Sequence, residues 1–301
     1  MRWRPILNVG IFDEPTRHMT SRHFSLWIVS PPDYLHSRCF EDVALGLHAA
    51  FAALGFDAPI VTDPLEIRDS AIVLGANLLP LLPGPLSPRL ILYNLEQIQK
   101  DSPWLRPAYI DLLRRYPVWD YSERNIDALK AHGVTNVALC GIGYMPVLTR
   151  IPPGGEDVDV LFIGSLNDRR KAVLGEIARH GKKVTVAYNS YGEQRDLVVA
   201  RAKLLLNVHF YESQIFEMVR VSHLLANRKC VVSETGLDDA LEAPLRPGIA
   251  FASYADLPAT CLRLLQDDGE RTRLARAGFD CFSALHQVPM LKRALDTLPA
   301  D

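Results

Sequence analysis

The chain has 301 residues, a length that favours two domains of ordinary size, each with its own core. Hydrophobic residues make up 48% of it and charged residues 23%, and the formal net charge of −2 gives no basic footprint for nucleic acid. No apolar run reaches the roughly 18 to 20 residues of a membrane span. Because Asp13, Glu14 and Pro15 also interrupt any signal-peptide core, we expect a cytoplasmic protein.

Strands and helices alternate through the first half of the chain. Residues 1–23 show no clear period and predict a surface arm or an edge element. Strands are expected at 24–30, 58–62, 70–76, 89–94, 118–122 and 136–140, and helices at 40–55, 105–116 and 123–132. This alternation predicts a parallel, doubly wound α/β sheet.

Residues 141–156 contain four glycines and three prolines with little apolar periodicity, which is typical of a linker. A second series follows, with strands expected at 157–164, 182–188, 203–210, 230–234 and 248–253 and helices between and after them up to residue 298. We therefore predict two Rossmann-like, doubly wound domains that face each other across a cleft. Their expected bounds are 1–145 and 146–285, with a terminal helix in 286–301.

Five cysteines, an odd number, lie far apart with neither a C-x-x-C pair nor the Cys/His spacing of a metal site. They are Cys39, Cys140, Cys230, Cys261 and Cys281. We expect reduced, buried thiols, and neither a disulfide framework nor a zinc site.

The stretch 203–234 predicts a strand, a polar loop, a helix and a second strand. Its helix is expected to carry Glu217 and Arg220 in the first turn, three residues apart on one face and beside the positive end of the helix dipole. A nucleoside diphosphate suits such a place at the carboxyl edge of a parallel sheet. An exposed Glu/Arg pair is the alternative, but apolar neighbours such as Phe216 and Val219 argue against full exposure.

A second candidate for an anion site is LFIGSLNDRRK, in which small residues end a strand and basic residues begin a helix. The turn residues are Gly164 and Ser165, and the basic triplet is Arg169, Arg170 and Lys171. Backbone amides, a helix N-terminus and guanidinium groups can together hold phosphate oxygens. An ordinary turn with a solvated basic helix start remains possible, since neither a Walker loop nor a GxGxxG fingerprint is present.

The order of these segments, a strand ending in GS, then LLLNVHFYES and FEMVRVSHLLANRKCVVSE, resembles the donor half of GT-B glycosyltransferases. The likeness is to small bacterial CgeB-type and glycosyltransferase family 1-like proteins, and it covers most of residues 157–285. It implies that Arg169, Arg170 or Lys171 contacts the diphosphate of the donor. It also implies a donor pocket with Glu217 and Arg220, and a following loop whose Ser233 and Glu234 face the sugar or the ribose.

One departure from the related retaining enzymes concerns their two glutamates, which are usually eight positions apart. Here Glu212, in the loop that also holds Ser213, and Glu217, in the first turn of the helix, are only five apart, and the second glutamate position falls on His223. The stereochemical course of the reaction therefore stays open. The imidazole of His223 can bond a hydroxyl of the donor or be a satisfied core histidine.

The first half should hold the acceptor and, for an inverting enzyme, the general base. Candidates after its strands are His36, Glu96 and Asp120, and burial would raise the pKa of Glu96 toward neutrality. His36 can instead cap the next helix, and Asp120 can bond backbone groups. Tyr144 in the linker would border the cleft and stack on a base or sugar, with core packing as the alternative.

We thus expect a hexosyltransferase-type enzyme that moves a sugar from a UDP, dTDP or GDP donor to an acceptor hydroxyl without a cofactor. The acceptor, whether glycan, lipid-linked, protein or small molecule, is not indicated. No Asp-x-Asp stands in a suitable loop, and Asp238 and Asp239 are read as solvated, so no metal is expected. The alternatives are a nucleotide-sugar epimerase on the same fold and a non-catalytic sugar- or partner-binding protein.

Overall fold

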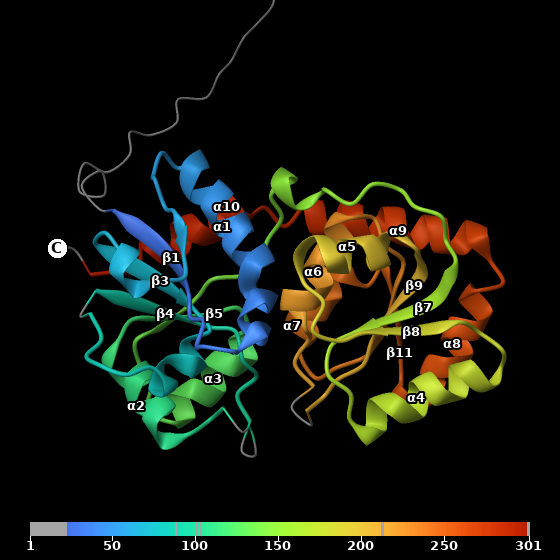
Figure 1. Cartoon of the computed structure of the whole chain (residues 1–301), viewed down its shortest axis with the longest axis horizontal. Coiled ribbons are helices and arrows are strands. Elements are labelled where there is room, and N and C mark those ends of the chain that lie inside the picture. The colour runs from blue at the N-terminus through green and yellow to red at the C-terminus, as the bar shows by residue number, and fades with distance from the viewer. Residues whose placement is uncertain (1–22, 88, 100–101, 103, 212–213, 300–301) are drawn as a thin grey trace, which may run out of the picture.

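The computed structural model of the chain describes residues 23–87, 89–99, 102, 104–211 and 214–299. The expected arm over 1–23 lies almost entirely outside this range, as do Glu212 and Ser213. Two parallel sheets lie side by side, each with helices on its faces (Figure 1). The prediction of two doubly wound α/β units is confirmed.

The first sheet has the strand order β2-β1-β3-β4-β5-β6, with every neighbouring pair parallel. Every residue of β1 and β4 is buried, because helices cover both faces of such a sheet. Its strands are β1 (Phe24–Ile28), β2 (Ile60–Val61), β3 (Ser70–Leu74), β4 (Leu90–Asn94), β5 (Val118–Asp120) and β6 (Val137–Leu139). Its helices are α1 (Glu41–Ala53), α2 (Pro107–Arg115) and α3 (Glu123–Ala131).

The second sheet has the strand order β11-β10-β9-β7-β8, again all parallel. Its strands are β7 (Val158–Ile163), β8 (Val184–Ala187), β9 (Ala202–Asn207), β10 (Val231–Glu234) and β11 (Ile249–Ala252). The helices are α4 (Asp168–Arg179), α5 (Gly192–Ala200), α6 (Met218–Ala226), α7 (Asp239–Glu242), α8 (Leu257–Leu264), α9 (Asp268–Ser283) and α10 (Gln287–Leu295). No helix in the described part of the chain is long and apolar enough to span a membrane.

Both sheets follow one plan, since the first strand of each lies between the second and the third. In the first sheet the chain leaves β1 toward β2 and leaves β3 toward β4, in opposite directions. In the second sheet it leaves β7 toward β8 and β9 toward β10 in the same opposed way, so each sheet has a crevice at the carboxyl ends of these two neighbouring strands. The two crevices belong to different halves of the chain. A ligand held by both halves would lie where these two edges meet.

The end of the chain returns to the first half, where α10 packs beside α1 (Figure 1). The amide of Gly143 in the connecting segment donates to Gln287 Oε1 at 2.7 Å. A Cβ on Gly143 would lie 2.6 Å from the carbonyl oxygen of Leu285, so only glycine fits between these two segments. Across the interface the buried Asp42 of α1 accepts hydrogen bonds from Arg195 and Arg150, each at 2.5 Å. These contacts hold the two sheets in one arrangement.

Candidate functional site

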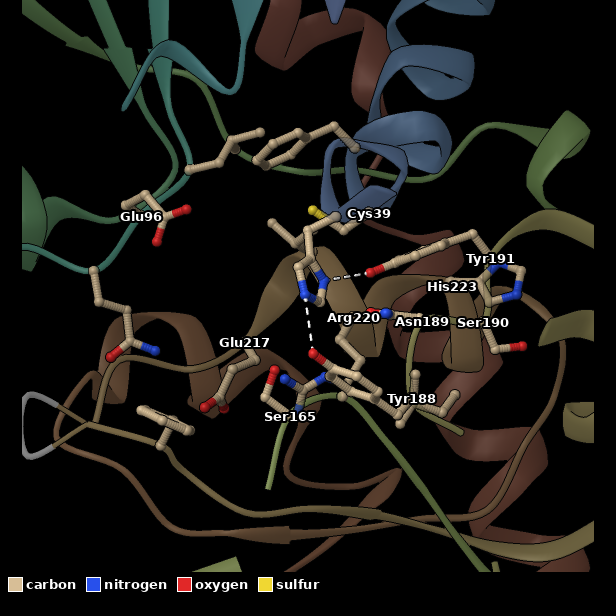
Figure 2. Close-up of a pocket in the computed structure, with 18 of the residues that line it drawn as sticks. Cys39, Glu96, Ser165, Tyr188, Asn189, Ser190, Tyr191, Glu217, Arg220 and His223 are labelled. Carbon is tan, nitrogen blue, oxygen red and sulfur yellow. Dashed lines mark hydrogen bonds between the residues drawn. The ribbon is translucent and has the colours of Figure 1, made fainter. Parts of the chain in front are cut away.

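A cavity of about 480 Å³ lies between the carboxyl edges of the two sheets. Loops after β1, β3 and β4 line it from the first half, and loops after β7, β8 and β9 with the start of α6 line it from the second (Figure 2). Eight of the residues singled out from the sequence line it: His36, Glu96, Gly164, Ser165, Arg170, Glu217, Arg220 and His223.

Arg220 is one of three arginines, with Arg170 and Arg195, by which the second half lines this cavity. Its Nη1 donates to Asn207 Oδ1 at 3.0 Å, and Asn207 Nδ2 donates to Glu217 Oε2 at 2.8 Å, so one amide orients both charged groups. The guanidinium lies against Gly164, where a Cβ would come within 3.3 Å of Nη2. Gly164 also has φ +126°, a value that L side chains rarely adopt. Glycine here lets Arg220 reach the end of β7.

The sequence predicted that Glu217 lies in the first turn of the helix. In the structure Glu217 is instead the residue just before the helix. The helix α6 begins at Met218, and Glu217 has φ −77° and ψ 62°, outside the helical range. The one-face argument for Glu217 and Arg220 was therefore wrong. Their association comes instead from Asn207 at the end of the neighbouring strand.

The charge of Glu217 is fixed by cations around it. Burial acts to raise its pKa, but the hydrogen bond from His209, the charges of His209 and Arg220 and the amide of Asn207 outweigh burial and lower the pKa to about 2. His209 Nδ1 lies 3.1 Å from Glu217 Oε2, and Arg170 Nη2 lies 3.9 Å from Oε1. One carboxylate thus faces two guanidinium groups and a histidine whose pKa is raised, and the excess positive charge of the guanidinium groups suits an anionic ligand.

The basic triplet after β7 divides into three environments. Arg170 is buried and donates to the carbonyl oxygens of Val208, at 2.7 and 2.9 Å, and of Ser165, at 2.8 Å, so it holds the turn beside the cavity. Arg169 lies outside the cavity lining, where its Nη1 donates to Glu234 at 2.6 Å and its guanidinium covers the ring of Tyr254. Lys171 is exposed and pairs with Asp168 at 3.4 Å.

The residues around the end of β10 lie behind the cavity. Ser233 and Glu234 are buried, and Ser233 Oγ accepts from Asn207 Nδ2 at 3.1 Å, so neither faces the open space. The expectation that Asp238 is solvated was wrong. Asp238 is 4% exposed and accepts a hydrogen bond from Ser122 Oγ at 2.5 Å, because the first half closes over it. Asp239 is exposed and pairs with Arg246 at 2.7 Å.

On the opposite wall, Glu96 lines the cavity from the loop after β4 (Figure 2). Burial raises the pKa of its carboxyl to about 7, and no cation of the described residues forms an ion pair with it. Its backbone carbonyl accepts from Asn94 Nδ2 and Asn125 Nδ2, each at 2.9 Å. A carboxyl that titrates near neutral pH and is held by its own loop can serve as a general base.

Asp120 lies behind this loop and does not line the cavity. Its oxygens accept from Asn94 Nδ2 at 2.6 Å, from the Ser122 amide at 2.9 Å and from Asn125 Nδ2 at 3.2 Å. Burial raises the pKa of Asp120 to about 7, while these three donors favour the ionised form. Asp120 thus supports the two asparagines that hold the Glu96 carbonyl.

His36 lines the cavity from the first half, in the segment after β1. Its Nδ1 lies 2.6 Å from the hydroxyl of Tyr191, and its Nε2 lies 3.4 Å from that of Tyr188. The ring is therefore bound to the second half of the chain. Glu96 and Glu217 lie toward one side of the cavity, and the loop 188–191 and His223 lie toward the other; the two sides are called compartments (Figure 2).

His223 and Tyr144 mainly contact other side chains of the protein rather than the open cavity. His223 is 2% exposed, and its Nε2 lies 2.9 Å from Asp196 Oδ1, while one edge of the ring reaches the cavity. Tyr144 lies outside the cavity lining. Its hydroxyl is 2.9 Å from Thr149 Oγ1, and its ring packs edge-on against Phe279 and Phe282.

Sequence reasoning missed the loop after β8 and two amide side chains. Tyr188, Asn189, Ser190 and Tyr191 all line the cavity. The polar run YNSY directly after an apolar strand was the available signal, since loops at that edge of a parallel sheet carry ligand sites. Asn207 and Gln97 were detectable only as polar residues beside apolar runs. Among the described residues, no group of three or more His, Cys, Asp or Glu side chains could hold a metal ion.

Solved glycosyltransferases share this architecture. Anabaena HepE in complex with UDP and glucose superposes with a TM-score of 0.59 at 11% identity, covering 91% of this chain and 98% of that chain. AviGT4, a glycosyltransferase of avilamycin A biosynthesis, gives 0.60 at 14% identity over 91% and 96%. WaaG, a glycosyltransferase of lipopolysaccharide biosynthesis, gives 0.56 at 13% over 93% and 100%. The chain therefore has the GT-B fold.

At the level of sequence, the chain is similar to uncharacterized proteins of Acanthamoeba polyphaga mimivirus. Protein L140 is 26% identical over 193 residues, 59% of this chain and 59% of that protein. Protein L138 is 29% identical over 114 residues, 37% of this chain and 13% of that protein. The chain thus spans less than two thirds of these relatives. No protein-family model matches it.

Proposed function

We propose that this GT-B-fold chain is a glycosyltransferase that moves a sugar from a nucleoside diphosphate to an acceptor hydroxyl. One observation carries the proposal: the cavity has a cationic wall, with Arg220 over Gly164, opposite a wall whose Glu96 has a pKa of about 7. The first wall suits a diphosphate leaving group, and the second suits proton abstraction from an acceptor.

The donor is best described as a UDP-sugar, since HepE has been solved with UDP-glucose. In this arrangement the diphosphate lies between Arg220, the turn at Gly164 and Ser165, and the N-terminus of α6. The nucleoside lies in the compartment with Tyr188 and Tyr191, whose rings are suited to stacking. The sugar then points to the compartment that contains Glu96.

In the reaction, the Glu96 carboxylate accepts the proton of the acceptor hydroxyl while its oxygen bonds to the anomeric carbon of the donor. The bond from that carbon to the β-phosphate oxygen breaks, and its electron pair leaves with the diphosphate, whose new charge Arg220 stabilises. A base on the wall opposite the leaving group favours inversion of configuration. The charge on the leaving group is met by side chains and a helix terminus, so the proposed reaction uses no metal or cofactor.

His36 is a weaker candidate for the base, because both of its ring nitrogens already face tyrosine hydroxyls of the second half. Asp120 is excluded by its place behind the Glu96 loop. The five free cysteines fit a reducing compartment, and we place the activity in the cytoplasm.

The test incubates the chain with UDP-glucose, other UDP-sugars, dTDP-glucose and GDP-mannose, each with and without a mixture of sugar, lipid-linked and peptide acceptors. We expect release of a nucleoside diphosphate that depends on the acceptor. A changed sugar without release would instead indicate an epimerase. If calorimetry detected no binding of any of these donors, the enzymatic proposal would be wrong.

A further inference from the structure

The residue after Glu96 joins the two halves of the chain directly. Gln97 is 7% exposed, and its Nε2 donates to the carbonyl oxygen of Ile215 at 2.8 Å. The amide of Ile215 donates back to Gln97 Oε1 at 3.3 Å. A side-chain amide can donate and accept at the same time, as a backbone peptide group does. The Gln97 side chain therefore pairs with the Ile215 backbone through two hydrogen bonds, as neighbouring strands of a sheet do.

Both partners of this pair lie next to the reacting groups. Gln97 follows Glu96 in sequence, and Ile215 precedes Glu217 by two residues. The pair is buried, so water does not compete for its hydrogen bonds. These two hydrogen bonds therefore join the wall with the base to the wall with the donor cations one residue from Glu96 and two residues from Glu217.

Each side of the pair is itself held rigidly. In the first half, Asn125 Oδ1 accepts from the Ile98 amide at 2.9 Å, and the Glu96 carbonyl is bonded on both sides as described above. In the second half, the carbonyl of Gln214 accepts from the Leu237 amide at 3.0 Å, and Ile215 and Phe216 are buried. Since these bonds hold the described part of each loop, the Gln97 amide sets the gap between them.

We infer that Gln97 is a positioning residue, whose amide fixes the distance between the Glu96 carboxylate and the donor held at Arg220. The inference rests on the proposed function. The contacts assigned to the donor lie in the second half, so donor binding does not depend on this pair. The attack of the acceptor does depend on it, because the base and the anomeric carbon are supplied from opposite walls.

Loss of the pair has a specific expected signature. The affinity for UDP stays within about threefold of wild type, while the turnover number for transfer falls roughly 10- to 100-fold, as is typical of a misplaced catalytic group. The gap also admits water, so the fraction of donor that is hydrolysed rather than transferred rises. Because Glu96 becomes better hydrated, the rising limb of the pH–rate profile moves to lower pH.

The experiment uses Gln97→Met, which keeps the volume of the side chain and removes both hydrogen bonds, with Gln97→Ala as a second variant. Gln287→Met is the matched control, since the buried Gln287 also donates to a backbone carbonyl, that of Gly141 at 3.1 Å, and accepts from a backbone amide, that of Gly143 at 2.7 Å, away from both loops and from the cavity lining. UDP affinity, turnover, hydrolysis fraction and pH profile are measured for each. Thermal unfolding compares their stability.

The inference is overturned if a folded Gln97→Met protein transfers at the wild-type rate with the wild-type pH profile. It is also overturned if UDP binding falls in proportion to transfer, or if Gln287→Met shows the same signature. A wild-type chain that binds UDP-sugars but never releases nucleotide would instead count against the proposed function, so the two failures are distinct.

Discussion

The two walls of the cavity are built on the same strand order but treat a carboxylate in opposite ways. Burial acts to raise the pKa of both Glu96 and Glu217. Glu96 has no compensating cation among the described residues, and its pKa rises to about 7. Glu217 faces His209 and Arg220, and its pKa falls to about 2.

The two sheets share a strand order, so the difference in pKa comes from the side chains that surround each carboxyl. These neighbouring side chains, rather than the fold, determine the chemical role of each sheet edge. An unpaired carboxyl near neutral pH can take up a proton, whereas a carboxylate fixed by cations only shapes the field around a bound anion. The asymmetry assigns proton transfer to the first half and stabilisation of the leaving group to the second.

The largest expected effect comes from removing the base. The Glu96→Gln variant should lose about 10²- to 10⁴-fold in transfer rate, the usual contribution of a positioned general base. Its affinity for UDP should be unchanged, because the contacts assigned to UDP lie on the other wall. Steady-state kinetics and calorimetry check both parts, and a full transfer rate would place the base elsewhere.

The second effect concerns the opposite wall. Replacing Arg220 by alanine should weaken UDP binding by about 1.5 to 3 kcal/mol, the range for a hydrogen bond to a charged group. Calorimetry measures the loss, and circular dichroism checks the fold. Unchanged affinity in a folded variant would show that the cationic wall does not bind the nucleotide.

A third, smaller effect is on stability. The folded pKa of Glu96, about 7, lies above its ordinary value of 4.5, so the folded state binds this proton more tightly than the unfolded state. The group therefore lowers stability as pH rises from about 4.5 to 7, and the loss is constant above that range. Since water in the cavity screens part of the effect, we expect Glu96→Gln to be more stable than wild type by about 1 to 2 kcal/mol at pH 8, with little difference at pH 4.

Denaturant unfolding at a series of pH values measures this difference. Asp120, whose pKa is also raised, is present in both proteins, so its contribution cancels when the two curves are subtracted. A difference that did not grow between pH 4.5 and 7 would contradict the raised pKa of Glu96.

The smallest expected effect is that of replacing Lys171, which tests how far the cationic wall extends. Lys171 is exposed and pairs only with Asp168 of its own helix among the described residues. Lys171→Ala should change stability by less than about 0.5 kcal/mol, as surface pairs do, and leave UDP affinity within about twofold. A loss of affinity as large as that of Arg220→Ala would extend the wall beyond the cavity.

The sequence was sufficient for the architecture, because strand and helix periods are local signals. Every strand of both sheets was predicted, and the carboxyl edges were correctly identified as the place where polar residues gather. Glu96, Arg220 and Gly164 could be selected because each directly follows or faces the end of an apolar run.

The remaining placements depend on contacts that no local pattern encodes. Successive residues of a helix point about 100° apart, so the neighbours Arg170 and Lys171 diverge into the cavity and the solvent, and only the packing of α4 decides which goes where. Asp238 is buried by Ser122, which lies 116 positions away in sequence. His36 meets Tyr191 at a separation of 155.

The return of the chain to its first half has a mechanical consequence. The backbone passes between the halves twice, in the segment after β6 and again before α10, and the two passages are joined by a parallel bridge between Tyr144 and His286. Two adjacent tethers remove the freedom to slide or twist that a single linker would leave. The orientation of one wall relative to the other is therefore set at this doubled crossing as well as at the Gln97 pair.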